Sequence, residues 1–426
     1  MTSTPRTGRA AASPAGVDPV SGRVIPPTGR RYLQLVLVLG ALISIGPLTI
    51  DMYLPALPAL AEDLDASDAA VQVTLTGMLG GLAFGQLLIG PASDALGRRR
   101  PLLAGLALHA VASLLCAVAP DVVSLSAVRV LQGFAGAAIS VNAMAIVRDL
   151  FVGAAAARLL SRLMLVIGAA PVLAPSLGGL ILEFTSWRGI FVVLAGFAVL
   201  LVTIAAFGLQ ETLPPSRRRS ARPMATLRTF RSLLRDPTFV ALVLVAGLTM
   251  SALFSYISGS PFVLQEIYGL SQRAYGVVFG CNALGIILGT QLNPLLLRRF
   301  RPSQVLTAGV VLGTGAAATM VLTSVTGFGG LFGLLIPLSV VVATCGLSLP
   351  NTPALALSRH GEAAGTAAAL LGAVQFGVGA VTAPLVGVLG TSTAVPMASV
   401  IFVGVGLAAV LLLTVIRRDP HVDTAH

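Results

Sequence analysis

Gly90-Pro-Ala-Ser-Asp94-Ala-Leu-Gly-Arg98-Arg-Arg100 lies between two long apolar stretches of the chain. A short connection between apolar segments needs only polar turn residues, yet this one combines an acid, a helix-breaking glycine and three arginines. Asp94 and Arg98 are one helical turn apart, so they can pair with each other or with neighbouring helix ends. The segment predicts a charge latch at a membrane surface. The alternative interpretation is a basic loop that only sets the topology.

The composition of the chain excludes a soluble domain. It is 56% hydrophobic and 10% charged, whereas soluble domains are roughly 25% charged. A chain of 426 residues can hold about twelve helical spans of roughly 20 residues each. The apolar runs are too long and too uniform for barrel strands, so we expect an all-α integral membrane protein. The expected spans cover residues 33–55, 72–91, 101–119, 122–144, 159–182, 189–209, 237–262, 274–297, 304–325, 328–349, 363–388 and 392–416.

The basic residues, all of them arginines, follow an alternating pattern along the chain. They gather before the first span and after the second, fourth, sixth, eighth, tenth and twelfth, whereas Asp and Glu dominate the connection after the first span. Because arginine-rich loops stay in the cytoplasm, this pattern predicts a multi-pass protein of the cytoplasmic (inner) membrane with both termini inside the cell. The net charge of +11 then reflects topology and contact with anionic lipid, and no nucleic-acid partner is expected.

The polar segment around residues 210–236 divides the expected spans into two sets of six. We expect a disordered cytoplasmic tail at 1–31, an N-terminal half at 32–209, a cytoplasmic linker at 210–236, a C-terminal half at 237–416 and a cytoplasmic tail at 417–426. Two parallel six-span halves with a substrate site between them are a known plan for transporters.

Five residues of the opening segment match a family signature. Gly90, Asp94, Gly97, Arg98 and Arg99 resemble the loop 2–3 motif of the major facilitator superfamily, G-x-x-x-D-x-x-G-[RK]-[RK]. The resemblance implies two pseudo-symmetric six-helix halves and a cytoplasmic gate. In that gate Asp94 would cap a helix of the opposite half, and the arginines would pair with cytoplasmic acids when the protein faces outward.

Arg129 lies within the fourth expected span. A charged side chain there costs a few kcal/mol, so it should face a polar cavity and have a partner. The sequence from Arg129 to Ala137 resembles the R-x-x-[QG]-G-x-[GA]-A motif of the same superfamily, in which the arginine is tied to proton coupling. The alternative is an arginine that extends to the outer interface near Asp121.

The fifth expected span carries a set of prolines and glycines: Gly168, Pro171, Pro175, Gly178 and Gly179. The prolines remove backbone hydrogen bonds and bend a helix, and the glycines let a neighbouring helix approach closely. The string resembles the antiporter motif of drug/proton exchangers in the superfamily, which symporters lack, although Ala174 replaces the usual glycine. The alternative is a kinked packing helix with no bearing on the direction of transport.

Asp51 is the only acid within the apolar spans. Its proton affinity would follow its surroundings, as a proton-coupled site requires; alternatively it caps the next turn at the outer interface. The string from Asp51 to Pro58 resembles the Bcr/CflA branch of drug exporters, as do the strings at 187–191 and 211–213. Some multidrug relatives carry a further acid where this chain has Ile43-Ser44, so Asp51 would act alone.

Polar side chains within the spans are candidates for lining a substrate cavity, although each can instead form an interhelical hydrogen bond. These are Tyr53, Asn142, Tyr256, Asn282 and Gln375. His109 is expected to be a packing residue, and Cys116, Cys281 and Cys345 small apolar packing residues rather than disulfide partners.

The expected function is export of a small organic compound of the drug or antibiotic class in exchange for protons, by alternating access between the two halves. Asp51 would carry the proton and Arg129 would modulate it. No enzyme activity, metal or cofactor is expected, since the proton gradient supplies the energy, and the chain should act as a monomer. The alternatives are a proton-coupled metabolite importer and a non-transporting membrane sensor.

Overall fold

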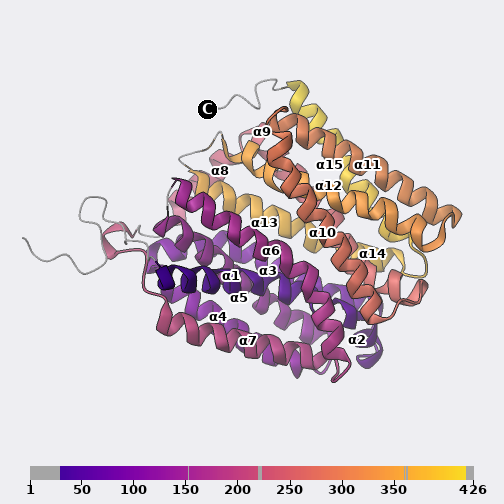
Figure 1. Ribbon diagram of the computed structural model, residues 1–426, viewed down its shortest axis with the longest axis horizontal. Coiled ribbons are helices and arrows are strands. Elements are labelled where there is room, and N and C mark those ends of the chain that lie inside the picture. The colour runs from indigo at the N-terminus through magenta and orange to yellow at the C-terminus, as the bar shows by residue number, and fades with distance from the viewer. Residues whose placement is uncertain (1–28, 152, 219–222, 359, 361–362, 419–426) are drawn as a thin grey trace, which may run out of the picture.

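The structure is a computed structural model, which describes residues 29–151, 153–218, 223–358, 360 and 363–418. The secondary structure over this part of the chain is helical, with no strand. Figure 1 shows two bundles side by side, the first coloured indigo to magenta and the second orange to yellow. The predicted all-α membrane fold is confirmed.

The N-terminal bundle contains six long helices and two short helical segments within the described residues. These are α1 (Gly29–Asp51), η1 (Leu54–Ala56), α2 (Leu57–Asp63), α3 (Asp68–Leu96), α4 (Arg99–Ala117), α5 (Val122–Leu150), α6 (Gly153–Leu182) and α7 (Trp187–Gly208). Polar caps mark where helices begin: the Ser67 hydroxyl accepts from the Ala70 amide at the start of α3, and Asp121 forms a capping box with Ser124 at the start of α5.

The C-terminal bundle repeats this arrangement after the connecting segment. The connection includes η2 (Pro215–Arg217) and α8 (Pro223–Leu233), and the bundle contains α9 (Pro237–Pro261), the π-helical turn η3 (Phe262–Ile267), α10 (Gln272–Leu296), α11 (Pro302–Thr326), α12 (Gly330–Ser358), α13 (Ala364–Thr382), α14 (Leu385–Leu389) and α15 (Val395–Arg418). The helices α13 and α14 together form one span that is interrupted at Pro384.

Eleven helical segments of the described chain are long and apolar enough to cross a membrane, and Gly168–Leu182 within α6 is a shorter apolar segment. Together they correspond to the twelve predicted spans. Several helices extend beyond the predicted boundaries, since α3 reaches Leu96, α5 reaches Leu150 and α12 reaches Ser358. Hydropathy marks only the apolar part of a helix, whereas its backbone hydrogen bonds continue into the polar layer.

The predicted tails lie largely outside the described residues, which begin at Gly29 and end at Arg418. The predicted linker contains helix α8, and residues 219–222 are not described.

Among the cysteines, Cys116 and Cys345 are buried as expected, but Cys281 is exposed, so the prediction that it packs inside the bundle is wrong. A sequence run of apolar residues does not reveal which face of a helix points outward.

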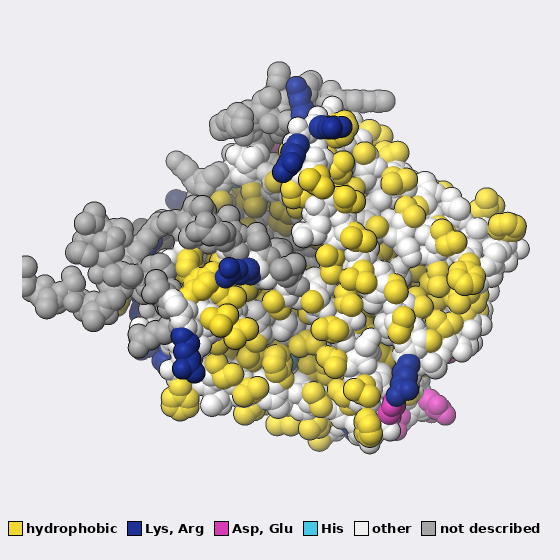
Figure 2. Space-filling model, viewed as in Figure 1, with side chains coloured by type: hydrophobic (Ala, Val, Ile, Leu, Met, Phe, Trp, Pro, Cys, Tyr) yellow, Lys and Arg dark blue, Asp and Glu magenta, His cyan; other side chains and the backbone are white. Residues whose placement is uncertain are grey.

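The bundle has two chemically different ends. We call the end with Arg98–Arg100, α8 and Arg298–Arg301 the basic end, and the end with residues 52–67, 118–121 and 183–186 the acidic end. Figure 2 shows apolar side chains over the flank of the molecule, most of the visible arginines toward the top and left, and acids at the lower right beside an arginine.

Two helix pairs join the halves, α3 with α13 and α6 with α10. Within the described residues, the side-chain hydrogen bonds between the halves all lie toward the acidic end. They join Thr76 to Ala380, Gln72 to Gly387, Asp68 to Thr391, Gln265 to Pro55, and Glu183 to Arg273. The halves are therefore fastened together at the acidic end.

Candidate functional site

Asp51 is the last residue of α1, where the helix gives way to the turn at Met52 and Tyr53. Its side chain is buried, with 4% of its surface exposed. The Oδ1 atom has no hydrogen-bond partner among the described residues. An ionised carboxylate is costly to bury without a partner, so this position is suited to a group that gains and loses a proton.

The glycine motif of α6 packs directly on this turn. A side chain at Gly178 would overlap the carbonyl oxygen of Met52, the residue after Asp51. Gly168 lies against Ile287 of α10, and Gly179 lies against the backbone of Gln272. Close helix approach, predicted from the glycines, is confirmed, and it connects the turn after Asp51 to the opposite half.

The two prolines of this motif, Pro171 and Pro175, lie within the single helix α6. The helix also brings Val172 and Ser176 against glycines of α10. The motif therefore supplies the contact surface between α6 and α10.

Arg129 is completely buried on α5. Its Nη1 donates to the Gln132 side-chain oxygen at 2.6 Å and to the Thr49 carbonyl at 3.2 Å. The guanidinium lies 4.3 Å from the centre of the Tyr53 ring, a cation–π contact. Its Nε and Nη2 atoms have no hydrogen-bond partner in the described chain. Arg129 thus points into the N-terminal bundle and does not extend to the outer interface.

A buried hydrogen-bond network surrounds Arg129. The Gln132 amide donates to the Ser113 hydroxyl at 2.8 Å, and His109 Nδ1 lies 3.4 Å from that hydroxyl. His109 Nε2 is 3.0 Å from the Thr49 hydroxyl. That hydroxyl donates to the Ile45 carbonyl, as the Ser113 hydroxyl does to the His109 carbonyl. His109 is a satisfied packing residue, as predicted.

Asp51 and Arg129 are both buried, but they are not paired in this structure, since the ion pairs among described residues do not include them. Thr49, two residues before Asp51, faces the Arg129 network of the N-terminal half. The turn that follows Asp51 contacts the C-terminal half, since the Gln265 side chain donates to the Pro55 carbonyl. The turn after α1 therefore lies between the two halves.

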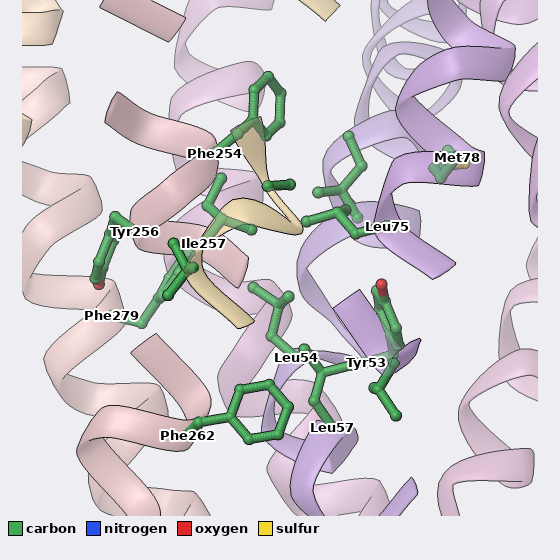
Figure 3. Close-up of a cluster of buried hydrophobic side chains, with 14 of the residues drawn as sticks. Tyr53, Leu54, Leu57, Leu75, Met78, Phe254, Tyr256, Ile257, Phe262 and Phe279 are labelled. Atoms are coloured by element: carbon green, nitrogen blue, oxygen red, sulfur yellow. The ribbon is translucent and has the colours of Figure 1, made fainter. Parts of the chain in front are cut away.

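Two predicted cavity residues meet in the C-terminal half. The Asn282 amide donates to the Tyr256 hydroxyl at 3.1 Å, and its oxygen accepts from Ser339 at 2.7 Å. Tyr256 stacks on Phe279 with ring centres 5.2 Å apart. Figure 3 shows Leu54 and Leu57 from the N-terminal half approaching Phe262 from the other, so apolar side chains close the interface here.

The remaining cavity candidates lie elsewhere. Asn142 is buried near the basic end, where its oxygen accepts from Ser93 at 2.6 Å and its amide donates to Ala138. The side-chain oxygen and nitrogen of Asn142 therefore both form hydrogen bonds within the N-terminal half. Gln375 is half-buried on α13 and makes no hydrogen bond to the described residues. The Tyr53 hydroxyl lies 3.3 Å from the Thr74 hydroxyl.

The arginines of the loop between α3 and α4 are held within the N-terminal half. Arg98 pairs with Asp94 at 2.6 Å and with Asp149 at 2.9 Å, and it donates to Ser93. Burial opposes its charge, but the hydrogen bonds and charges of the two acids outweigh this effect and raise the pKa of Arg98 above its ordinary value. Arg99 donates to the carbonyls of Leu209 and Ala206 at the end of α7.

Glu211 caps helix α4 from the segment after α7. Its carboxylate accepts from the Arg98 amide at 2.8 Å and from the Arg99 amide at 3.3 Å, where the helix dipole favours a negative charge. Gly97 has φ +91°, and a side chain there would overlap the Glu211 carboxylate. At Gly90, by contrast, an added side chain would meet nothing within 4 Å.

Sequence reasoning missed several members of these clusters. Asp149 pairs with Arg98, and Ser113 accepts from Gln132 in the network around Arg129, while Glu211 carries a family resemblance in the sequence but no sign of its capping role. Their distances along the chain, such as the 113 residues between Arg98 and Glu211, leave no local pattern. The one available signal was an acid, Asp149, beside an arginine at the end of an apolar span.

A comparison with protein families and known sequences agrees with this geometry. Residues 37–384 match the model of the Major Facilitator Superfamily. The chain is 42% identical over 384 residues to the MFS-type transporter YdgK of Bacillus subtilis, covering 88% of this chain and 94% of the relative. It is 32% identical over 362 residues to a bicyclomycin resistance protein homolog of Haemophilus influenzae, covering 85% and 91%. These relatives agree with the predicted branch.

Solved structures show the same fold at low sequence identity. A peptide transporter in complex with sulfate matches with a TM-score of 0.74 at 14% identity, over 94% of this chain and 97% of that one. A D-xylose-proton symporter matches with a TM-score of 0.68 at 17% identity, over 90% and 96%. The two helical halves, the charged loop after α3 and the family match together show that this chain is a membrane transporter of the Major Facilitator Superfamily.

Proposed function

We propose that the protein exports small organic compounds of the drug or antibiotic class in exchange for protons. The observation that carries this proposal is the buried carboxylate of Asp51, which has an unpartnered oxygen at the turn between the two halves. The packing of the α6 glycine motif on that turn supports it. The bicyclomycin resistance homolog, and a multidrug resistance protein of Citrobacter koseri that is 28% identical over 390 residues, support the substrate class.

We assign the basic end to the cytoplasm and the acidic end to the exterior of the cytoplasmic membrane, because arginine-rich loops remain inside. Both termini are then cytoplasmic, and the protein acts as a monomer without a cofactor. With this orientation the structure represents a state closed toward the exterior, because the hydrogen bonds that join the halves lie at the acidic end.

In the proposed cycle, Asp51 takes up a proton while the acidic end is open. A neutral carboxyl is less costly to bury than an ionised one, so the protonated protein closes at the acidic end more readily. A substrate arriving from the cytoplasm contacts Tyr256 and Asn282 and displaces the proton. The deprotonated carboxylate of Asp51 then favours the state that is open toward the exterior, and the substrate is released there.

Everted membrane vesicles test this function. Vesicles that contain the protein and have an acidic interior should accumulate at least one compound from an antibiotic panel. A protonophore, which collapses the proton gradient, should abolish the accumulation. Vesicles without the protein are the control. Accumulation that persists after the gradient collapses would rule out proton exchange, whereas gradient-driven uptake only in right-side-out vesicles would identify an importer.

A further inference from the structure

The span formed by α13 and α14 is broken, and the break leaves backbone groups without helical partners. Pro384 has no amide hydrogen, so the Ala380 carbonyl, four residues earlier, loses its helical donor. The Gly387 amide does not bond to the Ala383 carbonyl but points out of the helix. In a membrane such groups need other partners, because lipid offers none.

Side chains from neighbouring helices supply those partners. The Thr76 hydroxyl donates to the Ala380 carbonyl at 3.0 Å, and the Gln72 oxygen accepts from the Gly387 amide at 2.8 Å. The Ser258 hydroxyl donates to the Ala383 carbonyl at 2.8 Å. Ser258 belongs to the same half as the break, whereas Gln72 and Thr76 belong to the opposite half.

The residues that reach across the interface form a single stripe on α3. Asp68, Gln72 and Thr76 are four residues apart, so they lie on one face of the helix. Asp68 accepts a hydrogen bond from Thr391, beyond the end of α14. A side chain at Gly387 would come within 2.6 Å of the Ala69 Cα atom, so the two backbones are in direct contact.

We propose that this stripe is the gate at the acidic end, and that Thr76 and Gln72 are positioning residues that hold the gate shut through the backbone groups freed by Pro384. The proposal rests on the proposed function for the alternating movement of the halves. When the gate is shut, the freed groups are satisfied by the opposite half. When it opens, the Ala380 carbonyl and the Gly387 amide become accessible to water, so the break lets the same groups be satisfied in both states.

The hydrogen bond between the Thr76 hydroxyl and the Ala380 carbonyl predicts that the effect of a substitution at Thr76 depends on the residue at position 384. Pro384→Ala supplies an amide hydrogen that can bond to the Ala380 carbonyl within the helix. The Thr76 hydroxyl is then no longer needed, so removing it should matter only when Pro384 is present. A gate that depends on apolar packing alone predicts no such dependence, because valine and threonine have nearly the same shape.

The experiment measures opening of the gate without any substrate. Leu57, which is fully buried at the acidic end, is replaced by cysteine in a variant whose Cys116, Cys281 and Cys345 are alanine. A membrane-impermeant thiol reagent is added from outside to intact cells, and the labelling rate reports the open population. Thr76→Val should raise this rate about fivefold, the effect of losing one ordinary hydrogen bond, and Thr76→Ser should restore the native rate.

In the Pro384→Ala background, Thr76→Val should leave the labelling rate within about twofold of that background, since the lost bond has been replaced. Thr203→Val is the matched control, because the Thr203 hydroxyl bonds only to its own helix. Equal increases in both backgrounds, or a Thr76→Ser variant that labels like Thr76→Val, would overturn the proposal. If Pro384→Ala does not fold, the comparison of Thr76→Ser with Thr76→Val still tests whether the Thr76 hydroxyl holds the gate shut. If the protein shows no export but the labelling rates follow these predictions, the result would count against the proposed function and not against the gate.

Discussion

At the scale of single residues, the site contains two buried groups of opposite charge that do not meet. Arg129 is surrounded by Thr49, Gln132 and the Tyr53 ring, while Asp51 is buried at the end of α1 and forms no ion pair with it. Each has polar atoms without a hydrogen-bond partner among the described residues. Because such groups are destabilising, they are expected where function requires them.

Replacing Arg129 by methionine should separate function from stability. An apolar side chain of similar length removes a buried charge at little net cost, so the free energy of unfolding should change by no more than about 2 kcal/mol. Gradient-driven transport should fall by roughly tenfold or more, as expected when a coupling residue is lost. Thermal unfolding in detergent and vesicle uptake provide the two measurements.

Arg148→Met is the matched control, because Arg148 is an exposed arginine on the same helix. It should leave both quantities unchanged. A large loss of stability in Arg129→Met, in proportion to its loss of transport, would instead assign Arg129 a structural role.

At the scale of elements, the loop between α3 and α4 connects four helices of one half. Arg98 joins α3 to α5 through Asp149, and Glu211 caps α4 from the end of α7. Asp94 is 48% exposed and pairs only with Arg98 in the described chain. Among the described residues, the predicted contact of Asp94 with the opposite half is not made, which leaves that acid available for another conformational state.

The change Asp94→Asn should therefore affect transport more than stability. An exposed ion pair contributes about 1 kcal/mol or less, so the unfolding temperature should stay near that of the native protein. If Asp94 stabilises the outward-facing state by roughly 1–2 kcal/mol, its loss should shift the population and the transport rate several-fold. Arg100→Ala, at an exposed arginine of the same loop, should have little effect on either. Native transport by Asp94→Asn would leave the loop with a topological role only.

The sequence predicted the elements better than their contacts. Hydropathy and arginine placement located the spans, because both follow from the membrane itself. The glycines of α6 correctly predicted close packing, since only glycine permits it at Gly178. Three features could not be predicted, because each depends on how distant helices are aligned: the lack of an ion pair between Asp51 and Arg129 in the described chain, the Glu211 cap, and the hydrogen bond from Thr76 to Ala380.

At the scale of the whole molecule, two helical halves meet along α3 with α13 and α6 with α10. They are bonded at the acidic end, where apolar side chains of both halves pack together, and Asp51 is buried at the end of α1. Rocking of the halves would open this end and hydrate the carboxylate. In the proposed cycle, the protonation of Asp51 is coupled to the position of both halves.

Transport by Asp51→Asn tests this account most directly, with Asp121→Asn as the control because Asp121 is an exposed helix cap. The asparagine keeps the shape of the side chain but cannot titrate. In everted vesicles, Asp51→Asn should lose gradient-driven accumulation while retaining downhill exchange of labelled substrate, and Asp121→Asn should retain both. Full gradient-driven accumulation by Asp51→Asn for every transported compound would contradict the account and place the proton on another group.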